Sequence, residues 1–400
     1  MLQEKTLREQ ALRQRIEGEI RERGPMPFSR YMEICLYDPV GGYYARNAEQ
    51  FGKAGDFYTS SDVHAVFGRL LTRQFEEMWR TLDRPARLEI LELGPGRGLF
   101  ARDVLDWSRK KHPKFFAALT YTLQESSPAL RAKLKENLGE HVASGKAVVV
   151  EGGVTVVPGG SRGCSPDVPL IVFANEFFDA LPVEILGTRG KLHLVLEDGA
   201  LKDETGESGR LTEAWLASSA AEFEWLDHYG VQPEGDERIE VSLGARNWMA
   251  QIASSIGRGF LIAIDYGFTR GEQLAGRHRG TLMAYREHSA GGDPYQAPGE
   301  QDLTAHVNFT ALAAAAELAG LRAEKVITQA QFLMGIGEQT QFADAFEDCR
   351  VPQERAKVAL QLKHLVTPAG MGETFQVLVA SRGVDPPRIS ALSGLRFGAK

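Results

Sequence analysis

The feature that most constrains the fold is a run of short apolar segments that alternate with amphipathic ones from Arg87 onward. The apolar segments have the length of strands, and the others have the length and the end signals of helices. This alternation predicts parallel strands with helices on both faces, and continuous apolar strands suit a sheet buried on both sides. We therefore predict an α/β fold with a doubly wound parallel sheet. The predicted strands are RLEILEL, TYTLQE, KAVVVEGG, PLIVFANE and GFLIAIDYG.

About eighty residues separate the fourth predicted strand from the fifth, which is too long for one crossover. We expect an inserted cap here, with hairpin strands at LHLVLEDG and RIEVSL and a helix around Leu211–Trp225. The segments LRAEKVIT and TFQVLVASRG could supply two final strands of the sheet. The predicted boundaries are an N-terminal helical, cofactor-covering segment at 1–85, a core at 86–182 and 251–385, the cap at 183–250 and a loosely ordered tail at 386–400.

Helix signals are clearest near the two ends of the chain. Leu12, Ile16 and Ile20 recur at a spacing of four, and Gly24 with a following proline ends that helix. The alanine-rich segment TALAAAAELAG predicts a second helix, with Thr310 as its N-cap.

Composition excludes several classes of protein. Lys and Arg total 46 against 53 Asp and Glu, a net charge of −7, which argues against a protein that coats nucleic acid nonspecifically. The three cysteines are too widely spaced for a metal-ligand pair or a disulfide framework, which favours a reducing compartment. No apolar run is long enough to span a membrane. The N-terminal residues fit neither a secretory signal nor a mitochondrial transit peptide, so we expect a cytoplasmic protein.

The motif LELGPGRG lies between the first predicted strand and the following helix. Glycines at this position let the backbone turn tightly and approach a ligand closely. Dinucleotide binding requires a third glycine where this chain has Leu99, so the spacing argues against such a cofactor. The observed spacing is Glu92, Gly94, Gly96, Gly98, which resembles the first motif of the S-adenosyl-L-methionine (SAM) methyltransferases.

A second acid, Glu125, ends the second predicted strand. A carboxylate there can accept both hydrogen bonds of a ribose diol. A negative charge at a helix N-terminus is also favourable by itself, so a purely structural role stays open.

Polar residues also follow the fourth strand, because Asn175, Glu176 and Asp179 occur in ANEFFDALPVE. Ligands of open parallel sheets lie beyond the carboxyl ends of the strands. Paired carboxylates suit a guanidinium group, which is planar and carries five donors, and they can accept a proton during attack on a methyl group. Alternatively, Asp179 only caps a turn.

Other candidates lie near the end of the fifth strand and beyond it. Asp265 reaches the same edge of the sheet, and His306 precedes the alanine-rich helix. A lone histidine is more often structural than catalytic, so His306 is the weaker candidate. Tyr285 and His288 belong to a segment that we predict to be a loop.

These residues together resemble the MidA-like family, which includes the mitochondrial complex I assembly methyltransferase. The resemblance covers nearly the whole chain and rests on seven segments in the family's order. Departures from the family pattern occur at Ser61, Asp62 and Asn308. The segments are GPMPFSRYMEICLYDPVGGYY, GDFYTSSDVHAVFG, LELGPGRG, NEFFDALP, DYG, DLTAHVNF and MGETFQVL.

The resemblance implies a class I methyltransferase fold, SAM as methyl donor and, as in the mitochondrial member, arginine N-methylation of a protein. It implies that Gly94, Gly96 and Gly98 line the cofactor, with Asp56, Thr59 and Ser60 close by. It suggests a bacterial-type member whose partner is a protein that presents an arginine, of respiratory-complex type or another kind. Neither a nucleic-acid partner nor a metal is expected, and a homodimer stays open.

Three alternatives remain on the sequence alone. The first is an assembly protein that keeps SAM without turnover. The second is a methyltransferase of a small molecule. The third is a dinucleotide oxidoreductase, against which Leu99 already argues.

Overall fold

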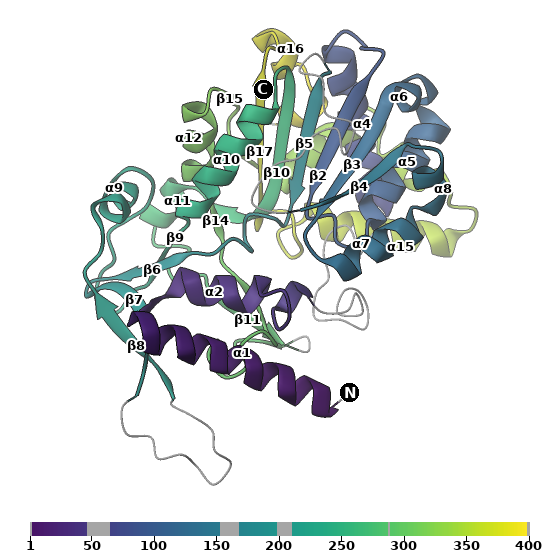
Figure 1. Cartoon of the computed structure of the whole chain (residues 1–400). Helices are drawn as coiled ribbons and strands as arrows, with labels where there is room; N and C mark the ends of the chain where they lie inside the picture. Colours follow the sequence, from purple (N-terminus) through teal and green to yellow (C-terminus); the bar gives the residue numbers. More distant parts are fainter. Residues whose placement is uncertain (1, 46–64, 153–167, 198–209, 287–288, 398–400) are drawn as a thin grey trace.

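The computed structural model in Figure 1 describes residues 2–45, 65–152, 168–197, 210–286 and 289–397. A large sheet with helices on both faces fills one half of the molecule. The two N-terminal helices, α1 and α2, lie with a smaller sheet in the other half, below the large one in this view.

The large sheet has the alternation that the sequence predicts. Five of its strands run parallel, and β17 pairs antiparallel with β10. Two short strands, β14 (Val307–Asn308) and β16 (Ile327–Thr328), join β10 and β17 respectively. The main order is β15 (Arg322–Ala323), β17 (Phe375–Arg382), β10 (Gly259–Phe268), β5 (Leu170–Asn175), β2 (Leu88–Leu93), β3 (Leu119–Glu125) and β4 (Ala147–Glu151).

Successive side chains of the central strands enter two different cores, because strand residues alternate between the faces of a sheet. Ile90 and Ile171 belong to one apolar cluster, while their neighbours Leu91 and Val172 belong to another. The first cluster is covered by α4 (Ala65–Thr81), α5 (Leu99–Lys111), α6 (Pro113–Ala118), α7 (Pro128–Asn137), α13 (Gln329–Glu338), α14 (Ala343–Phe346), α15 (Pro352–Val366) and α16 (Pro386–Ser390). The second is covered by α10 (Leu243–Ser255) and α12 (Phe309–Leu318).

The remaining helices are shorter or lie outside these layers. They are α8 (Gly139–Ala143), α9 (Ala220–Tyr229) and α11 (Arg270–Leu274). No helix in the described residues is both apolar enough and long enough to traverse a lipid bilayer.

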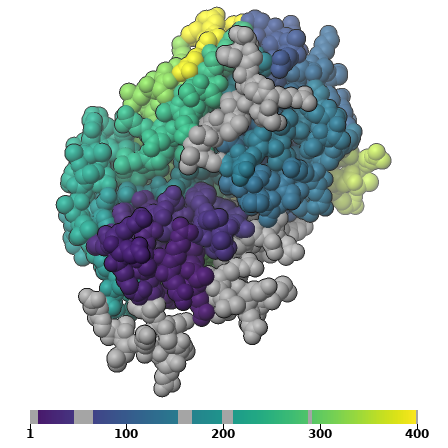
Figure 2. All heavy atoms as spheres, viewed as in Figure 1, coloured from purple at the N-terminus to yellow at the C-terminus, as the bar shows by residue number. Residues whose placement is uncertain are grey.

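The second unit combines three parts of the chain around one apolar cluster. Leu12, Ile16 and Ile20 of α1 are buried in this cluster, as predicted, against α2 and the smaller sheets. Figure 2 shows this N-terminal part, in purple, lying against the teal surface of the insertion. The helices are α1 (Leu2–Arg23), α2 (Phe28–Tyr37) and the 3-10 helix η1 (Tyr43–Ala45). One sheet contains β1 (Met26–Pro27), β6 (Glu184–Gly187), β7 (Gly190–Leu196), β8 (Leu211–Leu216) and β9 (Ile239–Val241). The other contains β11 (Met283–Arg286), β12 (Ser289–Ala290) and β13 (Asp302–Thr304).

The predicted domain boundaries differ from this arrangement. Residues 65–81 were assigned to the N-terminal segment, but α4 covers the large sheet. Residues 283–305 were assigned to the core, yet Ala284, Leu303 and Ala305 are buried with α1 and α2. Packing partners far along the chain decide these boundaries, and composition does not reveal them.

The helix predicted around Leu211–Trp225 is wrong in its first half. Residues 211–216 form strand β8, which pairs antiparallel with β7 along its whole length. The helix begins only after Ser219, whose hydroxyl accepts the Glu222 N–H while the Glu222 carboxylate accepts the Ser219 N–H. This capping box fixes the helix start.

Two further predictions need correction. Asn308, not Thr310, caps α12, since its Oδ1 accepts the N–H of Ala311 at 3.0 Å. The tail predicted as loosely ordered contains buried residues, including Ile389, Leu392 and Ser393. The N–H of Ser393 donates to Glu77 at 2.9 Å, and that of Gly394 donates to Gln74 at 3.0 Å.

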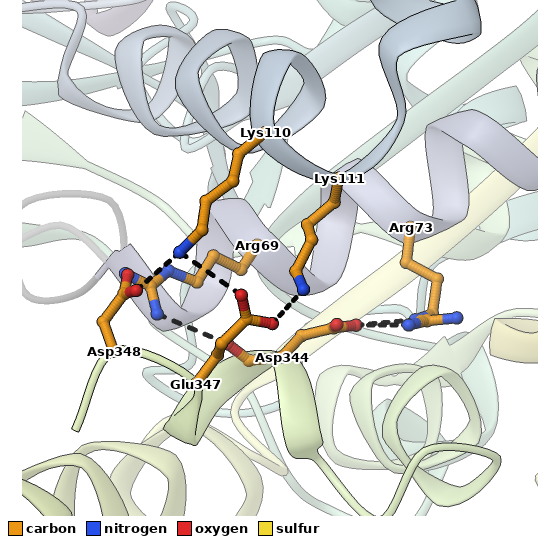
Figure 3. Close-up of polar contacts among 7 residues, drawn as sticks. All are labelled: Arg69, Arg73, Lys110, Lys111, Asp344, Glu347 and Asp348. Carbon is orange, nitrogen blue, oxygen red and sulfur yellow. Dashed lines mark hydrogen bonds and ion pairs between the residues drawn. The ribbon is translucent and has the colours of Figure 1, made fainter. Parts of the chain in front are cut away.

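A charged cluster ties α14 to the helices of the first face (Figure 3). Arg69 on α4 and Lys110 on α5 both reach Asp348, each at 2.6 Å. Lys111 pairs with Glu347, and Arg73 donates to Asp344 at 2.8 Å. The pairs of Asp348 are exposed and contribute little individually, whereas Asp344 is buried where it meets Arg73.

Strand order places one crevice at the centre of the large sheet. From β2 the chain proceeds to β3 and β4 on one side, then returns to β5 on the other side of β2. Open α/β sheets bind ligands at such a reversal, beyond the carboxyl ends of the strands. The site is therefore expected between the ends of β2 and β5.

Candidate functional site

A cavity of about 400 Å³ occupies this position. Its size is within the range of roughly 300–1,000 Å³ that is typical of small-molecule sites. Both units of the molecule line it. The residues that line it include Glu33, Tyr37, Tyr44, Glu92, Gly94, Gly96, Glu125, Asn175, Glu176, Asp179, Trp248 and Asp302.

The glycine loop after β2 forms one wall. Gly94, Gly96 and Gly98 all have positive φ, at 64°, 54° and 73°, which side-chain-bearing residues rarely adopt. Gly94 and Gly96 line the cavity, and a Cβ built on Gly96 would meet no protein atom within 4 Å. The space over Gly96 is thus open to a ligand.

Gly98 has a different role from the one predicted. It does not line the cavity. A Cβ at Gly98 would lie 2.5 Å from Leu134 and 3.2 Å from Leu138, so this glycine allows α5 and α7 to pack closely. Close helix packing is a known reason for a glycine in such loops.

Two buried carboxyl groups stand at the ends of β2 and β3. The hydroxyl of Tyr121 donates to Glu92 at 3.0 Å, and burial raises the pKa of Glu92 to about 8. Glu125 accepts the N–H of Ser127 at 2.8 Å, and burial raises its pKa to about 7. Glu125 lies at the N-terminus of α7 and also lines the cavity, so the structure is compatible with both roles considered from the sequence.

The segment after β5 forms the next wall. Glu176 has φ of 51°, an unusual value for a residue with a side chain, and the amide of Asn175 donates to its carboxylate at 3.1 Å. Asn175, Glu176 and Asp179 all line the cavity, so the structure brings together the three residues predicted for catalysis at this strand end.

Asp265 holds this segment in place. It is fully buried at the end of β10, and its Oδ2 accepts the backbone N–H groups of Phe177, Phe178 and Asp179 at 3.1, 2.8 and 3.3 Å. Its Oδ1 accepts the N–H of Tyr266 at 2.9 Å. Asp265 is a positioning residue, because it fixes the backbone that carries the cavity carboxylates.

Burial and like charge act together on Asp179. Burial contributes most and the neighbouring Glu176 adds to it, so that the pKa of Asp179 rises to about 7. A carboxyl group that titrates near neutral pH can accept and release a proton during turnover.

His306 lies away from the cavity. Its Nδ1 is 3.2 Å from Nδ1 of His278, its ring stacks on Tyr266, and burial lowers its pKa to about 4. It is absent from the cavity lining, which does not favour the predicted catalytic role. Asn308 is likewise a helix cap. Asp56, Thr59 and Ser60 lie outside the described residues.

Several lining residues were not singled out from the sequence. Tyr37 and Tyr44 come from α2 and η1, Trp248 from α10 and Asp302 from β13. The pair Tyr43–Tyr44 after the Pro39–Gly42 turn is a signal that could have suggested Tyr44. Asp302 and Trp248 have no local signature, because only the packing of the two units brings them here.

The charges around the cavity are strongly one-sided. Among the described lining residues, six are acidic, namely Glu33, Glu92, Glu125, Glu176, Asp179 and Asp302, and one, Arg97, is basic. In their ionised form these carboxyl groups favour cationic ligands. Within the described part of the chain, no group of His, Cys, Asp and Glu side chains is arranged to hold a metal ion.

A family model described as "Putative S-adenosyl-L-methionine-dependent methyltransferase" matches residues 70–327, which include the glycine loop, the β5 segment and Asp302. The chain belongs to this methyltransferase family. The resemblance predicted from the ordered sequence motifs is thereby confirmed, and the dinucleotide oxidoreductase alternative falls away.

Relatives of this methyltransferase share most of its length. It is 30% identical to the Drosophila melanogaster "Protein arginine methyltransferase NDUFAF7 homolog, mitochondrial", over 94% of this chain and 85% of the relative. It is 28% identical to the human protein arginine methyltransferase NDUFAF7, over 89% of this chain and 80% of the relative.

Solved structures confirm the class I methyltransferase fold. A Burkholderia thailandensis protein, crystallised with S-adenosyl-homocysteine, superimposes with a TM-score of 0.80 at 28% identity, covering 97% of this chain and 95% of that one. A native crystal structure from the same organism gives a TM-score of 0.77 with the same identity and coverage.

Proposed function

We propose that this methyltransferase uses SAM to methylate a guanidinium nitrogen of an arginine side chain in a protein. One observation carries the proposal: the carboxylates of Glu176 and Asp179 line the same cavity as the glycine loop. The names of the relatives, protein arginine methyltransferases, support the same acceptor.

The glycine-loop half of the cavity fits SAM. Gly94 and Gly96 both line it, the space over Gly96 is open, and Glu125 stands where a carboxylate can accept from a ribose diol. Bound S-adenosyl-homocysteine in the Burkholderia thailandensis structure supports this assignment. When bound, SAM supplies an electrophilic methyl group on a positively charged sulfur.

Asn175, Glu176 and Asp179 would act on the acceptor. Carboxylates bind the planar guanidinium through directed, charge-assisted hydrogen bonds and orient one nitrogen toward the methyl group. As the N–CH₃ bond forms, the bond from that methyl to sulfur breaks and its electron pair stays on sulfur. The nitrogen then loses a proton, which a carboxylate oxygen of Asp179 accepts.

Incubation with methyl-labelled SAM and a soluble bacterial cell extract tests this function. We expect label in methylarginine after acid hydrolysis of a protein band, and loss of that label with Glu176→Gln while S-adenosyl-homocysteine still binds. Label confined to small molecules would favour a small-molecule methyltransferase. No label, with tight cofactor binding, would favour an assembly protein without turnover. The predicted cytoplasmic location stays a prediction.

A further inference from the structure

Another wall of the cavity is formed by α2, η1 and β13, whose residues have no role in the proposed reaction. The hydroxyl of Tyr44 in η1 donates to Oδ1 of Asp302 in β13 at 3.0 Å. The hydroxyl of Tyr37 in α2 donates to the backbone oxygen of Ala180, in the segment after β5, at 2.9 Å. The bond from Tyr37 joins the second unit to the segment that carries the proposed catalytic carboxylates, whereas the bond from Tyr44 holds Asp302 within the second unit.

Hydrogen bonds and close backbone packing fix this wall in place. Asp38 Oδ1 accepts the N–H groups of Val40 and Gly41 at 2.9 and 2.7 Å, which fixes the turn between α2 and η1. Gly299, at φ of 75°, packs so closely on this turn that a Cβ there would lie 2.3 Å from the Gly41 oxygen. The segment that leads to Asp302 is therefore seated directly on the α2–η1 turn.

Electrostatics place Asp302 and Asp179 around the same group of phenols. After burial, the charge of Asp302 is the largest cause that raises the pKa of Tyr44 and of Tyr37, and Asp179 adds to both. The pKa of Tyr285 on β11 is raised by burial and by the same two carboxylates. Asp302 and Asp179 thus act on one small region from two different units.

We propose that Asp302 binds the guanidinium of the acceptor arginine from the side opposite Asp179, and that Tyr44 is the positioning residue that orients Asp302. The proposal rests on the proposed function. A guanidinium has five donors in one plane, so it can bond to carboxylates on two sides at once. A carboxylate can accept several hydrogen bonds at once, so Asp302 can accept from Tyr44 and from a guanidinium nitrogen together.

Two probes of similar shape, one charged and one neutral, test the role of Asp302 without turnover. N-acetyl-L-arginine amide carries the guanidinium, and N-acetyl-L-citrulline amide is its uncharged counterpart. Binding of each is measured by NMR titration on the protein saturated with S-adenosyl-homocysteine. We expect the wild type to prefer the arginine probe, and Asp302→Asn to lose roughly tenfold or more of that preference, the scale of one charge-assisted hydrogen bond.

Asp293→Asn is the matched control. Asp293 lies on the same segment, is exposed and does not line the cavity, and among the described contacts its carboxylate accepts only the local N–H of Tyr295, at 3.0 Å. The Asp293→Asn variant should leave the preference unchanged.

Tyr44→Phe keeps the ring and should lower the preference less than Asp302→Asn. In the labelled assay, Asp302→Asn should raise KM for the protein acceptor about tenfold more than it lowers kcat.

The outcomes separate the two levels of the proposal. An unchanged preference in Asp302→Asn, with an active wild type, overturns the role of Asp302 and leaves the proposed function standing. A parallel loss of S-adenosyl-homocysteine affinity also overturns it, because Asp302 would then support the fold or the cofactor. A wild type that neither prefers the arginine probe nor labels arginine overturns the proposed function, and the assignment of Asp302 with it.

Discussion

The two halves of the cavity are assembled in different ways. The cofactor half comes from one β–α–β unit, with Glu92, Gly94, Gly96 and Glu125 supplied by two strand ends and one loop. The acceptor half combines residues from α2, η1, the β5 segment, α10 and β13, which are far apart in the chain. A site within one unit leaves a motif in the sequence, whereas a site between units leaves scattered single residues.

The largest expected effect is a loss of cofactor affinity caused by a substitution in the cofactor half of the cavity. Gly96→Val should weaken S-adenosyl-homocysteine binding at least about a hundredfold, because its side chain enters the space that the ligand needs. Gly145→Val is the control, since Gly145 also has positive φ, 72°, and open space around it but lies outside the cavity. Both variants should lose about 1–2 kcal/mol of stability from backbone strain. Calorimetric titration and thermal unfolding measure the two quantities.

The next effect concerns the acceptor half. Asp265→Asn replaces an oxygen that accepts three N–H groups, so the segment with Glu176 and Asp179 should shift. We expect kcat to fall by about a hundredfold, while S-adenosyl-homocysteine affinity changes less than about threefold. A comparable loss of both would show that the two halves are not separable.

Glu240→Gln is the control for this variant. Glu240 is also buried and accepts backbone N–H groups, from Thr281 and Leu282 at 2.9 and 3.1 Å, but does not line the cavity. It should cost stability of the same order, about 1–3 kcal/mol, with little change in kcat. Single-turnover rates and urea unfolding distinguish the two variants.

A smaller effect comes from pH. Burial raises the pKa of Glu92 to about 8 and those of Glu125 and Asp179 to about 7, so the folded protein binds more protons than the unfolded chain between about pH 4 and 8. Ligand-free stability from these groups should therefore fall as pH rises through that window. Ionised carboxylates attract the sulfonium of SAM, so its affinity relative to S-adenosyl-homocysteine, which lacks the sulfonium charge, should rise about tenfold from pH 6 to 8.5.

The same titration sharpens the comparison of the halves. Glu125→Gln and Asp179→Asn each remove one of the raised carboxyl groups, one from each half. If the cofactor half determines the pH dependence, only the first variant should flatten it. An affinity ratio that stays constant with pH in the wild type would contradict the prediction. Calorimetry with both ligands at four pH values measures the ratio.

The smallest effect is expected far from both halves. Asp348→Asn removes the partner of Arg69 and Lys110 in the cluster of Figure 3. Because Asp348 is exposed, the loss of unfolding free energy should be below about 1 kcal/mol and should vanish in 1 M salt. Urea unfolding at low and high salt measures it. A change in kcat or in cofactor affinity would mean that α14 communicates with the cavity.

The sequence predicts the large sheet well because each of its strands is fixed locally. The five predicted strands correspond to β2, β3, β4, β5 and β10, and the final pair to β15–β16 and β17. Leu211–Leu216 shows the limit of local patterns, since this segment becomes a strand only through its pairing with β7.

Site residues are likewise predictable from the sequence where their position is fixed locally. Glu92, Gly94, Gly96, Glu125, Asn175, Glu176 and Asp179 follow directly from strand ends, and all seven line the cavity. Gly98 shares the motif but serves helix packing, because a glycine required for close packing looks the same in a sequence as one required by a ligand. His306 follows no such strand end, and its ring faces His278 and Tyr266.

The bonds from Tyr37 to Ala180 and from Tyr44 to Asp302 have a consequence for how such proteins diversify. The first bond joins the second unit to the segment after β5, the second holds Asp302 within the second unit, and none of these four residues belongs to the glycine loop. Substitutions at Tyr44 or Asp302 can alter which acceptor is admitted while the cofactor seat stays intact. Descendants of one ancestral gene can in this way exchange one acceptor for another and keep the same methyl donor.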